Sequence, residues 1–195
     1  ARVHTYPSVM CWAACDRLAK AARHLRLYDR AEVWAERARI IHERIEAEAY
    51  LPEEGRFAAS FGGTELDASL LQMTDLGFLD ARDPRQVKTF EAVERDLKKG
   101  PYLFRYIHPD DFGEAETAFN FCTFWFIEAL HLNGRTEEAR VIFDEMLSRR
   151  THAGLLSEDI SLQDGELWGN YPQTYSLVGI INCAVLLSRS WQDAR

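Results

Sequence analysis

The sequence has no excess of positive charge, no long apolar run and no spaced set of metal ligands. Its 195 residues carry a formal net charge of -8, which argues against a nucleic-acid groove because such a groove needs a basic surface. No apolar run approaches the roughly 20 residues that a membrane-spanning helix requires. We therefore expect neither a nucleic-acid partner nor membrane insertion.

Histidine and cysteine are too scattered to indicate a metal. The six histidines include no His-x3-His pair, and the four cysteines include no Cys-x2-Cys pair. No glycine-rich loop follows a predicted strand, so the sequence predicts no cofactor either. The cysteines fall in predicted helices, mostly on apolar faces, as reduced core residues do; they are Cys11, Cys15, Cys122 and Cys183. This usage favours a reducing compartment, and we expect a cytoplasmic protein.

What the sequence does contain is helical patterning. Spacings of three and four between apolar residues, together with start and stop signals, predict seven helices, at 7–27, 30–49, 66–75, 85–98, 117–132, 136–149 and 175–188. Short connections predict antiparallel helical hairpins, and no strand of any length is predicted. The expected fold is therefore all-α, with the longer irregular stretches together at one end of the helices.

Several local features accompany these helices. Asp29 and Thr136 are predicted to cap the helices that follow them, and Asp67 is better explained as a helix N-cap than as a substrate contact. Asp16 and Arg17 are expected to form a structural ion pair. These residues are assigned to the scaffold.

The stretch 151–171 differs most from plain helical sequence. It contains two adjacent acids, Glu158 and Asp159, and two aromatic residues, Trp168 and Tyr171. Loops of this length in a compact domain are usually functional. Glu158 is either a catalytic carboxylate or a solvated loop acid, and Asp159 is either a supporting residue or a hydrogen-bonding neighbour.

Four stretches, in order and spanning nearly the whole chain, resemble segments of one enzyme family. They are VMCWAACDR at 9–17, GTELDASLL at 63–71, FCTFW at 121–125, and GLLSE at 154–158 followed by GNYPQ at 169–173. These are similar to motifs of bacterial glycoside hydrolases of family 15. The resemblance implies a six-hairpin (α/α)6 toroid, of which residues 1–195 would be a single segment, about the C-terminal half of the catalytic domain.

The resemblance also implies a reaction. Family members release glucose from the non-reducing ends of α-glucosides with inversion, using a general acid and a general base about 6.5–9.5 Å apart with water between them. Glu158 matches the general base, which must be ionised and therefore should lie in a polar, hydrogen-bonded setting. The family's acid lies in a Trp-Glu motif upstream of the 9–17 helix. This chain begins too late to contain that motif, so we expect residues 1–195 alone to be inactive.

Some residues match a glucose-binding pocket of the family. Arg105, beside Tyr106, matches an Arg-Tyr pair whose planar guanidinium can bond two sugar hydroxyls, although a surface Arg is the alternative. Glu116 matches an acidic position near the same subsite. Trp168 and Tyr171 could stack on a sugar or serve as hydrophobic plugs.

Three further candidates have structural alternatives. Gln173 could bond a sugar hydroxyl or cap the last helix. Tyr6 precedes the first helix where the family has a polar or aromatic residue facing the cleft, but Pro7 and Ser8 depart from the family pattern. Trp12 could be a sugar platform, although a core position explains it better.

The expected substrate is an α-linked gluco-oligosaccharide or disaccharide, with α-1,4, α-1,6 and trehalose linkages left open. Half a toroid would expose apolar surface, which predicts self-association or association with the missing N-terminal half. The alternative function is a non-catalytic α-helical repeat-type protein-interaction scaffold, because 29–32 and 134–140 resemble pieces of helical repeats. Unequal connections argue against a constant repeat of about 34 residues.

Overall fold

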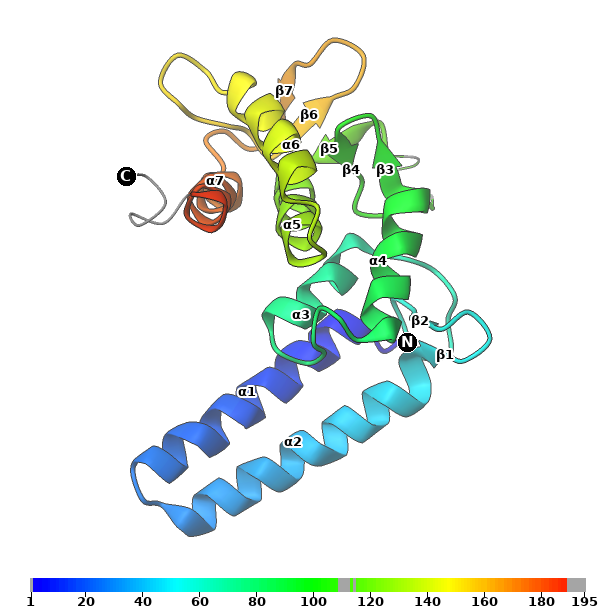
Figure 1. Cartoon of the computed structure of the whole chain (residues 1–195), viewed down its shortest axis with the longest axis vertical. Coiled ribbons are helices and arrows are strands. Elements are labelled where there is room, and N and C mark those ends of the chain that lie inside the picture. Colours follow the sequence, from blue (N-terminus) through cyan, green and yellow to red (C-terminus); the bar gives the residue numbers. More distant parts are fainter. Residues whose placement is uncertain (1, 109–112, 114, 189–195) are drawn as a thin grey trace. The chain divides into compact units, whose positions relative to one another are not determined.

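The computed structural model describes residues 2–108, 113 and 115–188, which form two compact units, Ala1–Ala92 and Val93–Arg195 (Figure 1). Helices α1 to α3, the 3-10 helix η1 and the strands β1 and β2 belong to the first unit. Helices α5 to α7 and the strands β3 to β7 belong to the second, and helix α4 (Pro84–Leu97) crosses the boundary between the units. The assignment of 1–195 to a single domain segment stays a prediction.

The first unit is built on an antiparallel hairpin of α1 (Thr5–His24) and α2 (Tyr28–Ala49), seen side by side in Figure 1. Small buried residues bring the two helices together, among them Ala19 and Ala31, and Val9 and Ile45 add apolar area. The predicted apolar stripe of α1 is only partly correct, since Met10 and Leu18 are exposed.

Short elements follow this hairpin. Strand β1 (Tyr50–Leu51) pairs with β2 (Arg56–Phe57), and η1 (Ala68–Leu71) continues into α3 (Gln72–Asp75). Asp67 caps η1, because its carboxylate accepts hydrogen bonds from the backbone N–H and the hydroxyl of Ser69. The prediction of an N-cap at Asp67 is confirmed.

Charged pairs also hold this unit. Asp16 accepts from Arg17 at 3.2 Å and from Lys20 at 2.8 Å, which confirms the predicted ion pair. The guanidinium of Arg17 also reaches the carbonyl oxygen of Leu76 at 2.7 Å. Arg17 therefore links α1 to the residue that follows α3.

In the second unit, α5 (Asn120–Leu132) is the central helix, packed against α6 (Thr136–Ser148) and α7 (Thr174–Leu187). Phe124, Phe126 and Leu130 of α5 are almost fully buried, as its apolar surface on all sides predicts. The backbone of α7 comes close to α5 at Gly179, where a Cβ would lie 2.8 Å from the Phe124 Cβ. Glycine at this position permits the close packing.

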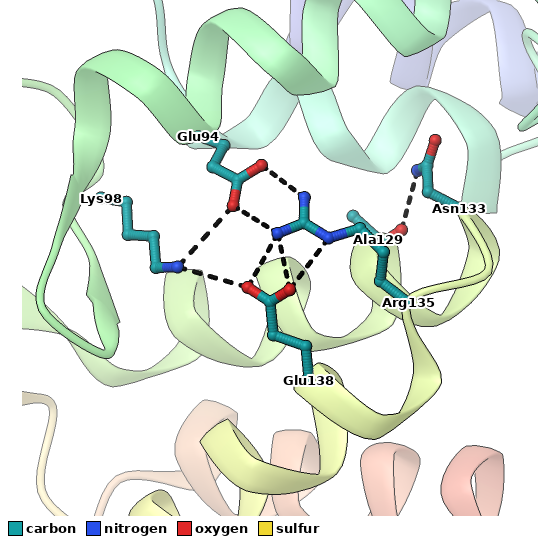
Figure 2. A network of polar contacts seen from close by, with 6 residues as sticks. All are labelled: Glu94, Lys98, Ala129, Asn133, Arg135 and Glu138. Carbon is teal, nitrogen blue, oxygen red and sulfur yellow. Dashed lines mark hydrogen bonds and ion pairs between the residues drawn. The ribbon is translucent and has the colours of Figure 1, made fainter.

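A network of charges connects α4 to α6 within this unit (Figure 2). Arg135 donates to Glu94 and Glu138, and Lys98 lies 3.7 Å from Glu94 and 3.4 Å from Glu138. The hydrogen bond from Arg135 is the main cause that lowers the pKa of the Glu138 carboxyl. The Lys98 ammonium also lies 5.4 Å from the centre of the Phe126 ring of α5, so the network also ties the start of β3 to α5.

The structure corrects the prediction that strands are absent. Besides β1 and β2, it contains the pair β3 (Lys98–Lys99) and β4 (Tyr102–Leu103), and a three-stranded antiparallel sheet of β5 (Thr117–Phe119), β6 (Asp159–Ser161) and β7 (Leu167–Trp168). Residues 117–119, predicted as the first turn of a helix, form β5. The fold class is nevertheless all-α in character, because the strands are only two or three residues long.

The predicted caps at Asp29 and Thr136 are wrong. Leu27 and Arg135 occupy those N-cap positions, and neither side chain makes a capping hydrogen bond. Asp29 instead lies in the first turn of α2, where a negative charge favours the helix dipole. Thr136 bonds the His131 ring at 3.1 Å.

The structure also tests the expected burial of the cysteines. All four cysteines are free, but only Cys122 and Cys183 are buried, so the prediction that most lie on core-facing sides holds for half of them. Burial raises the pKa of the Cys183 thiol well above its ordinary value.

Among the residues that the structure describes, no helix is both long and apolar enough to cross a bilayer.

Candidate active site

The stretch 151–171 is ordered by the sheet of β5, β6 and β7. In the register of this sheet, Asp159 lies opposite Phe119 on one side and Trp168 on the other. Ile160, the alternate residue of β6, is fully buried, as expected when one face of a sheet packs on the core. Figure 1 shows β5 leading directly into α5, with β6 beside it. The predicted loop is thus attached to the central helix of its unit.

The backbone of Glu158 is held on both sides. Its N–H donates to the Asn170 carbonyl oxygen at 2.9 Å, and its own carbonyl oxygen accepts from the Asn120 N–H at 2.9 Å. Asn120 is the first residue of α5, so the start of this buried helix fixes the position of Glu158. A backbone hydrogen-bonded in both directions fixes the point from which the side chain extends.

The Glu158 carboxylate is oriented by Asn170. Its Oε2 accepts from the Asn170 Nδ2 at 2.8 Å and from the Asn170 backbone N–H at 3.1 Å. Two donors on one oxygen fix the orientation of the carboxylate. This is the polar, hydrogen-bonded setting that a general base requires.

Gly169 allows this approach. Its φ is +78°, a conformation that suits glycine, and a Cβ there would lie 3.0 Å from both the Cβ and the Oε2 of Glu158. The Gly-Asn pair at 169–170 therefore has a physical reason: glycine makes room for the carboxylate, and asparagine holds it. The sequence marked both residues as part of a motif but gave neither a role.

A buried polar cluster supports the residue before Glu158. The carbonyl oxygen of Ser157 accepts from the Asn120 Nδ2 at 2.9 Å and from the Ser176 hydroxyl at 2.7 Å. Ser157, Asn120 and Ser176 are all fully buried. Helices α5 and α7 thus hold the residue before Glu158 together, a role of Asn120 and Ser176 that no sequence signal indicated.

Asp159 lies next to Glu158 in a more buried setting. Its Oδ2 accepts from the Thr117 hydroxyl at 3.1 Å, while its Oδ1 is buried without a hydrogen-bond partner among the described residues. Burial raises the pKa of the Asp159 carboxyl, the Thr117 hydrogen bond opposes this, and the negative charge of Glu158 adds to it. Asp159 is therefore a neighbour of Glu158 whose carboxylate bonds Thr117.

Two predicted binding residues make structural contacts in the same loop. The Gln173 side chain accepts from the Tyr175 N–H at 3.4 Å and caps α7, the alternative that the sequence could not separate from sugar binding. The Tyr171 hydroxyl lies 3.1 Å from the Thr151 hydroxyl, which closes the base of the loop. Their sugar-binding roles stay predictions.

Glu116 and Trp168 are brought together in one pocket. The pocket has a volume of about 700 Å³ and is also lined by residues of the β6–β7 hairpin and of the chain on either side of β4. Arg105 is not among its lining residues; it is exposed, with its guanidinium 5.8 Å from the centre of the Tyr106 ring. The predicted glucose-binding residues therefore do not all line the same pocket.

Tyr6 and Trp12 belong to the first unit. Tyr6 is partly buried in the first turn of α1. Trp12 is buried, with its ring 5.2 Å from that of Phe78 and 6.0 Å from that of His42, both edge to face. This is the core packing that the sequence favoured for Trp12, and a contact of either residue with substrate stays a prediction. Within the described part of the chain, no group of three His, Cys, Asp or Glu residues could hold a metal.

Comparison with known proteins identifies related sequences. The sequence model of the glycosyl hydrolases family 15 matches residues 2–185. A trehalase from Thermoplasma acidophilum is 34% identical over 189 residues, covering 96% of this chain and 32% of the trehalase. A trehalase from Mycobacterium tuberculosis is 32% identical over 196 residues, covering 97% of this chain and 28% of the relative. The chain thus spans about a third of the length of these relatives.

Solved structures show the same fold. A glycosidase variant in complex with glucose superposes with a TM-score of 0.81 at 17% identity, covering 95% of this chain and 52% of that one. A bacterial glucoamylase complexed with acarbose superposes with a TM-score of 0.76 at 16% identity, covering 94% of this chain and 33% of that one. The expected fold class, a part of the family's (α/α)6 arrangement, is confirmed by these matches.

Proposed function

This chain belongs to glycosyl hydrolase family 15, and on that premise we propose that it carries the general base of an inverting, exo-acting α-glucoside hydrolase, Glu158. The observation that supports this most directly is the double hydrogen bond from Asn170 to the Glu158 carboxylate. A carboxylate oriented in this way can remove a proton from water as the water attacks the anomeric carbon.

The proposal gives each nearby group a task. Glu158 takes the proton of the attacking water on the face of the sugar opposite the leaving group, while an acid on the other face protonates the glycosidic oxygen. The family's acid motif is absent from residues 1–195, so we assign the acid to a part of the domain outside this chain. The isolated chain should then be inactive.

The relatives support a choice of substrate class. An α-linked glucose disaccharide or oligosaccharide is the proposed substrate, and trehalose is the first to test because the reported sequence relatives are named trehalases. Maltose and isomaltose represent the α-1,4 and α-1,6 alternatives. A cytoplasmic location and association with the remaining part of the domain stay predictions.

The test is Glu158→Gln in a protein that contains the complete catalytic domain. Loss of the general base should lower kcat about 100-fold or more, with a small change in KM. Glu166→Gln is the matched control, because Glu166 is an exposed acid of the same loop outside the pocket. NMR of the glucose anomer that is released first shows whether the anomeric carbon is inverted.

Three results would contradict the proposal. Near-normal kcat in Glu158→Gln would remove the assignment of Glu158 as the base. Retention at the anomeric carbon would contradict the inverting mechanism. Turnover of trehalose, maltose or isomaltose by residues 1–195 alone would contradict the assignment of the acid.

A further inference from the structure

The connection between α1 and α2 is exposed over its whole length. Residues 23–30, which we call the α1–α2 turn, include the end of α1 and the start of α2, and every one of them is exposed. Figure 1 shows this turn at the end of the helical hairpin that points away from α3, β1 and β2 of the same unit. The turn is therefore a convex projection of the first unit.

Three large apolar side chains of the α1–α2 turn face solvent. Leu25 is 65% exposed, Tyr28 61% and Leu27 44%. Single exposed apolar residues are ordinary, but several of them together mark a surface that docks on a protein or on a membrane. Three such residues within four consecutive positions predict a docking surface at this turn.

Arginines alternate with these apolar residues. Arg23, Arg26 and Arg30 are exposed, and none of the three makes an ion pair within the described part of the chain, whereas the cations earlier in α1 are paired. Asp29 is the one acid among residues 23–30, and Glu32 is the next acid in α2. The turn thus carries a local excess of positive charge in a chain whose net charge is -8.

Arg26 has a backbone conformation that is unfavourable for arginine. Its φ is +59°, and among the described residues it is the one with a positive φ that is not glycine. An L residue in this conformation brings its Cβ too close to a carbonyl oxygen, so helices that end in this way usually have glycine there. An exposed, unpaired arginine at such a position indicates that its side chain serves a purpose other than folding stability.

We infer that the α1–α2 turn docks on an anionic lipid bilayer, with Leu25, Leu27 and Tyr28 entering the interface and the three arginines binding lipid phosphates. Apolar side chains at the end of a projection, with cations beside them, match the order of a bilayer surface, where acyl chains lie beneath the phosphates. A protein partner would need a cleft to receive this projection, and a nucleic acid would leave the leucines in water.

This docking uses a turn and not a membrane-spanning helix, and its few anchoring groups predict reversible binding. It does not depend on the proposed function, since none of its residues belongs to the candidate active site. Failure of one therefore leaves the other intact.

Vesicle sedimentation of the protein that contains the complete catalytic domain tests the inference. We expect binding to vesicles of equimolar phosphatidylcholine and phosphatidylglycerol, and much weaker binding to phosphatidylcholine alone. Arg26→Gln should lower the partition coefficient about fivefold, the effect of removing one cation near an anionic surface. Arg82→Gln is the matched control and should leave binding unchanged, because Arg82 is another exposed arginine of the first unit without an ion pair among the described residues.

Two further variants separate docking from folding stability and lipid from other anions. Arg26→Gly should weaken binding as much as Arg26→Gln does, but it should have the higher melting temperature of the two, because glycine accepts a positive φ. Leu25→Ser removes apolar area without changing charge, so it should also lower the partition coefficient about fivefold.

Four results would overturn the inference. They are equal binding to the two kinds of vesicle, an equal loss of binding in Arg82→Gln and Arg26→Gln, and a melting temperature of Arg26→Gly no higher than that of Arg26→Gln. The fourth is vesicle binding that is unaffected by Leu25→Ser and abolished by soluble polyglutamate, because this result would assign the turn to an acidic protein partner.

Discussion

The variant Gly169→Ala tests whether the position of the Glu158 carboxylate affects the reaction rate beyond any effect on the stability of the loop. An alanine at φ +78° costs about 1 kcal/mol or more in backbone strain. Its methyl group would also lie 3.0 Å from the Cβ and the Oε2 of Glu158, closer than ordinary contact. Because the Glu158 backbone is hydrogen-bonded on both sides, the carboxylate itself must shift by a few tenths of an ångström.

That shift affects catalysis more than folding. A misplacement of 1 Å can cost about 100-fold in rate, so a displacement of a few tenths should lower kcat about tenfold. KM should change little, because the general base acts on water rather than on bound sugar. The expected phenotype is therefore a modest stability loss with a disproportionate loss of kcat.

Gly154→Ala is the matched control. Gly154 lies in the same loop with the same φ of +78°, but a Cβ there would meet nothing within 4 Å. Urea unfolding should show similar losses in the free energy of unfolding for the two variants. Steady-state kinetics on the sugar that the parent hydrolyses should show a loss of kcat only for Gly169→Ala. If Gly169→Ala keeps kcat within threefold of the parent, or Gly154→Ala loses as much, the steric argument is refuted.

Two stability predictions concern the second unit. Gly179→Ala should lower the melting temperature, since overpacking against Phe124 costs about 1–3 kcal/mol and exceeds the roughly 1 kcal/mol of helix propensity gained; a raised melting temperature would contradict this. Glu138→Gln should destabilise the protein at pH 7 by up to about 1 kcal/mol, a small value because Glu138 and Arg135 are more than a third exposed. Since Arg135 lowers the pKa of Glu138 in the folded state, this stabilisation is present above the ordinary carboxyl pKa and is lost as pH falls through the folded value. Urea unfolding of the parent and of Glu138→Gln should show that the difference in their free energies of unfolding disappears below about pH 4. A difference that stays the same at all pH values would refute the reasoning.

The long helices could be predicted because their cause is local. Six of the seven predicted helices agree with observed ones within three residues at each end, namely with α1, α2, α4, α5, α6 and α7. Capping was predicted poorly, as Asp29 and Thr136 show, because a favourable residue type does not fix the residue at which the first turn begins.

The strands could not be predicted because their cause is not local. Residues 117–119 read as part of the following apolar helix, yet they form β5 by pairing with β6, some forty residues away. Strands of two or three residues contain too few positions to show an alternating pattern. Their existence depends on partners brought together by the helices.

The candidate site was predicted in part. The motif at 154–158 singled out Glu158, but the group that orients its carboxylate lies 12 residues away across a hairpin. The roles of Asn120 and Ser176 likewise depend on two helices meeting behind the loop. Residue types could indicate which acid to examine, whereas the groups that hold Glu158 in place could be identified only from the tertiary structure.

The pairing of β6 with β7 has a consequence for how such a site can diversify. The pairing of Asp159 with Trp168 closes the hairpin just before the contact between Glu158 and Asn170, while residues 162–164 lie at the hairpin tip and line the pocket. Insertions or substitutions at the tip can therefore reshape the pocket without moving the base, since loop tips tolerate changes in length. A lineage could therefore change the shape of this pocket while the contact between Glu158 and Asn170 stays the same.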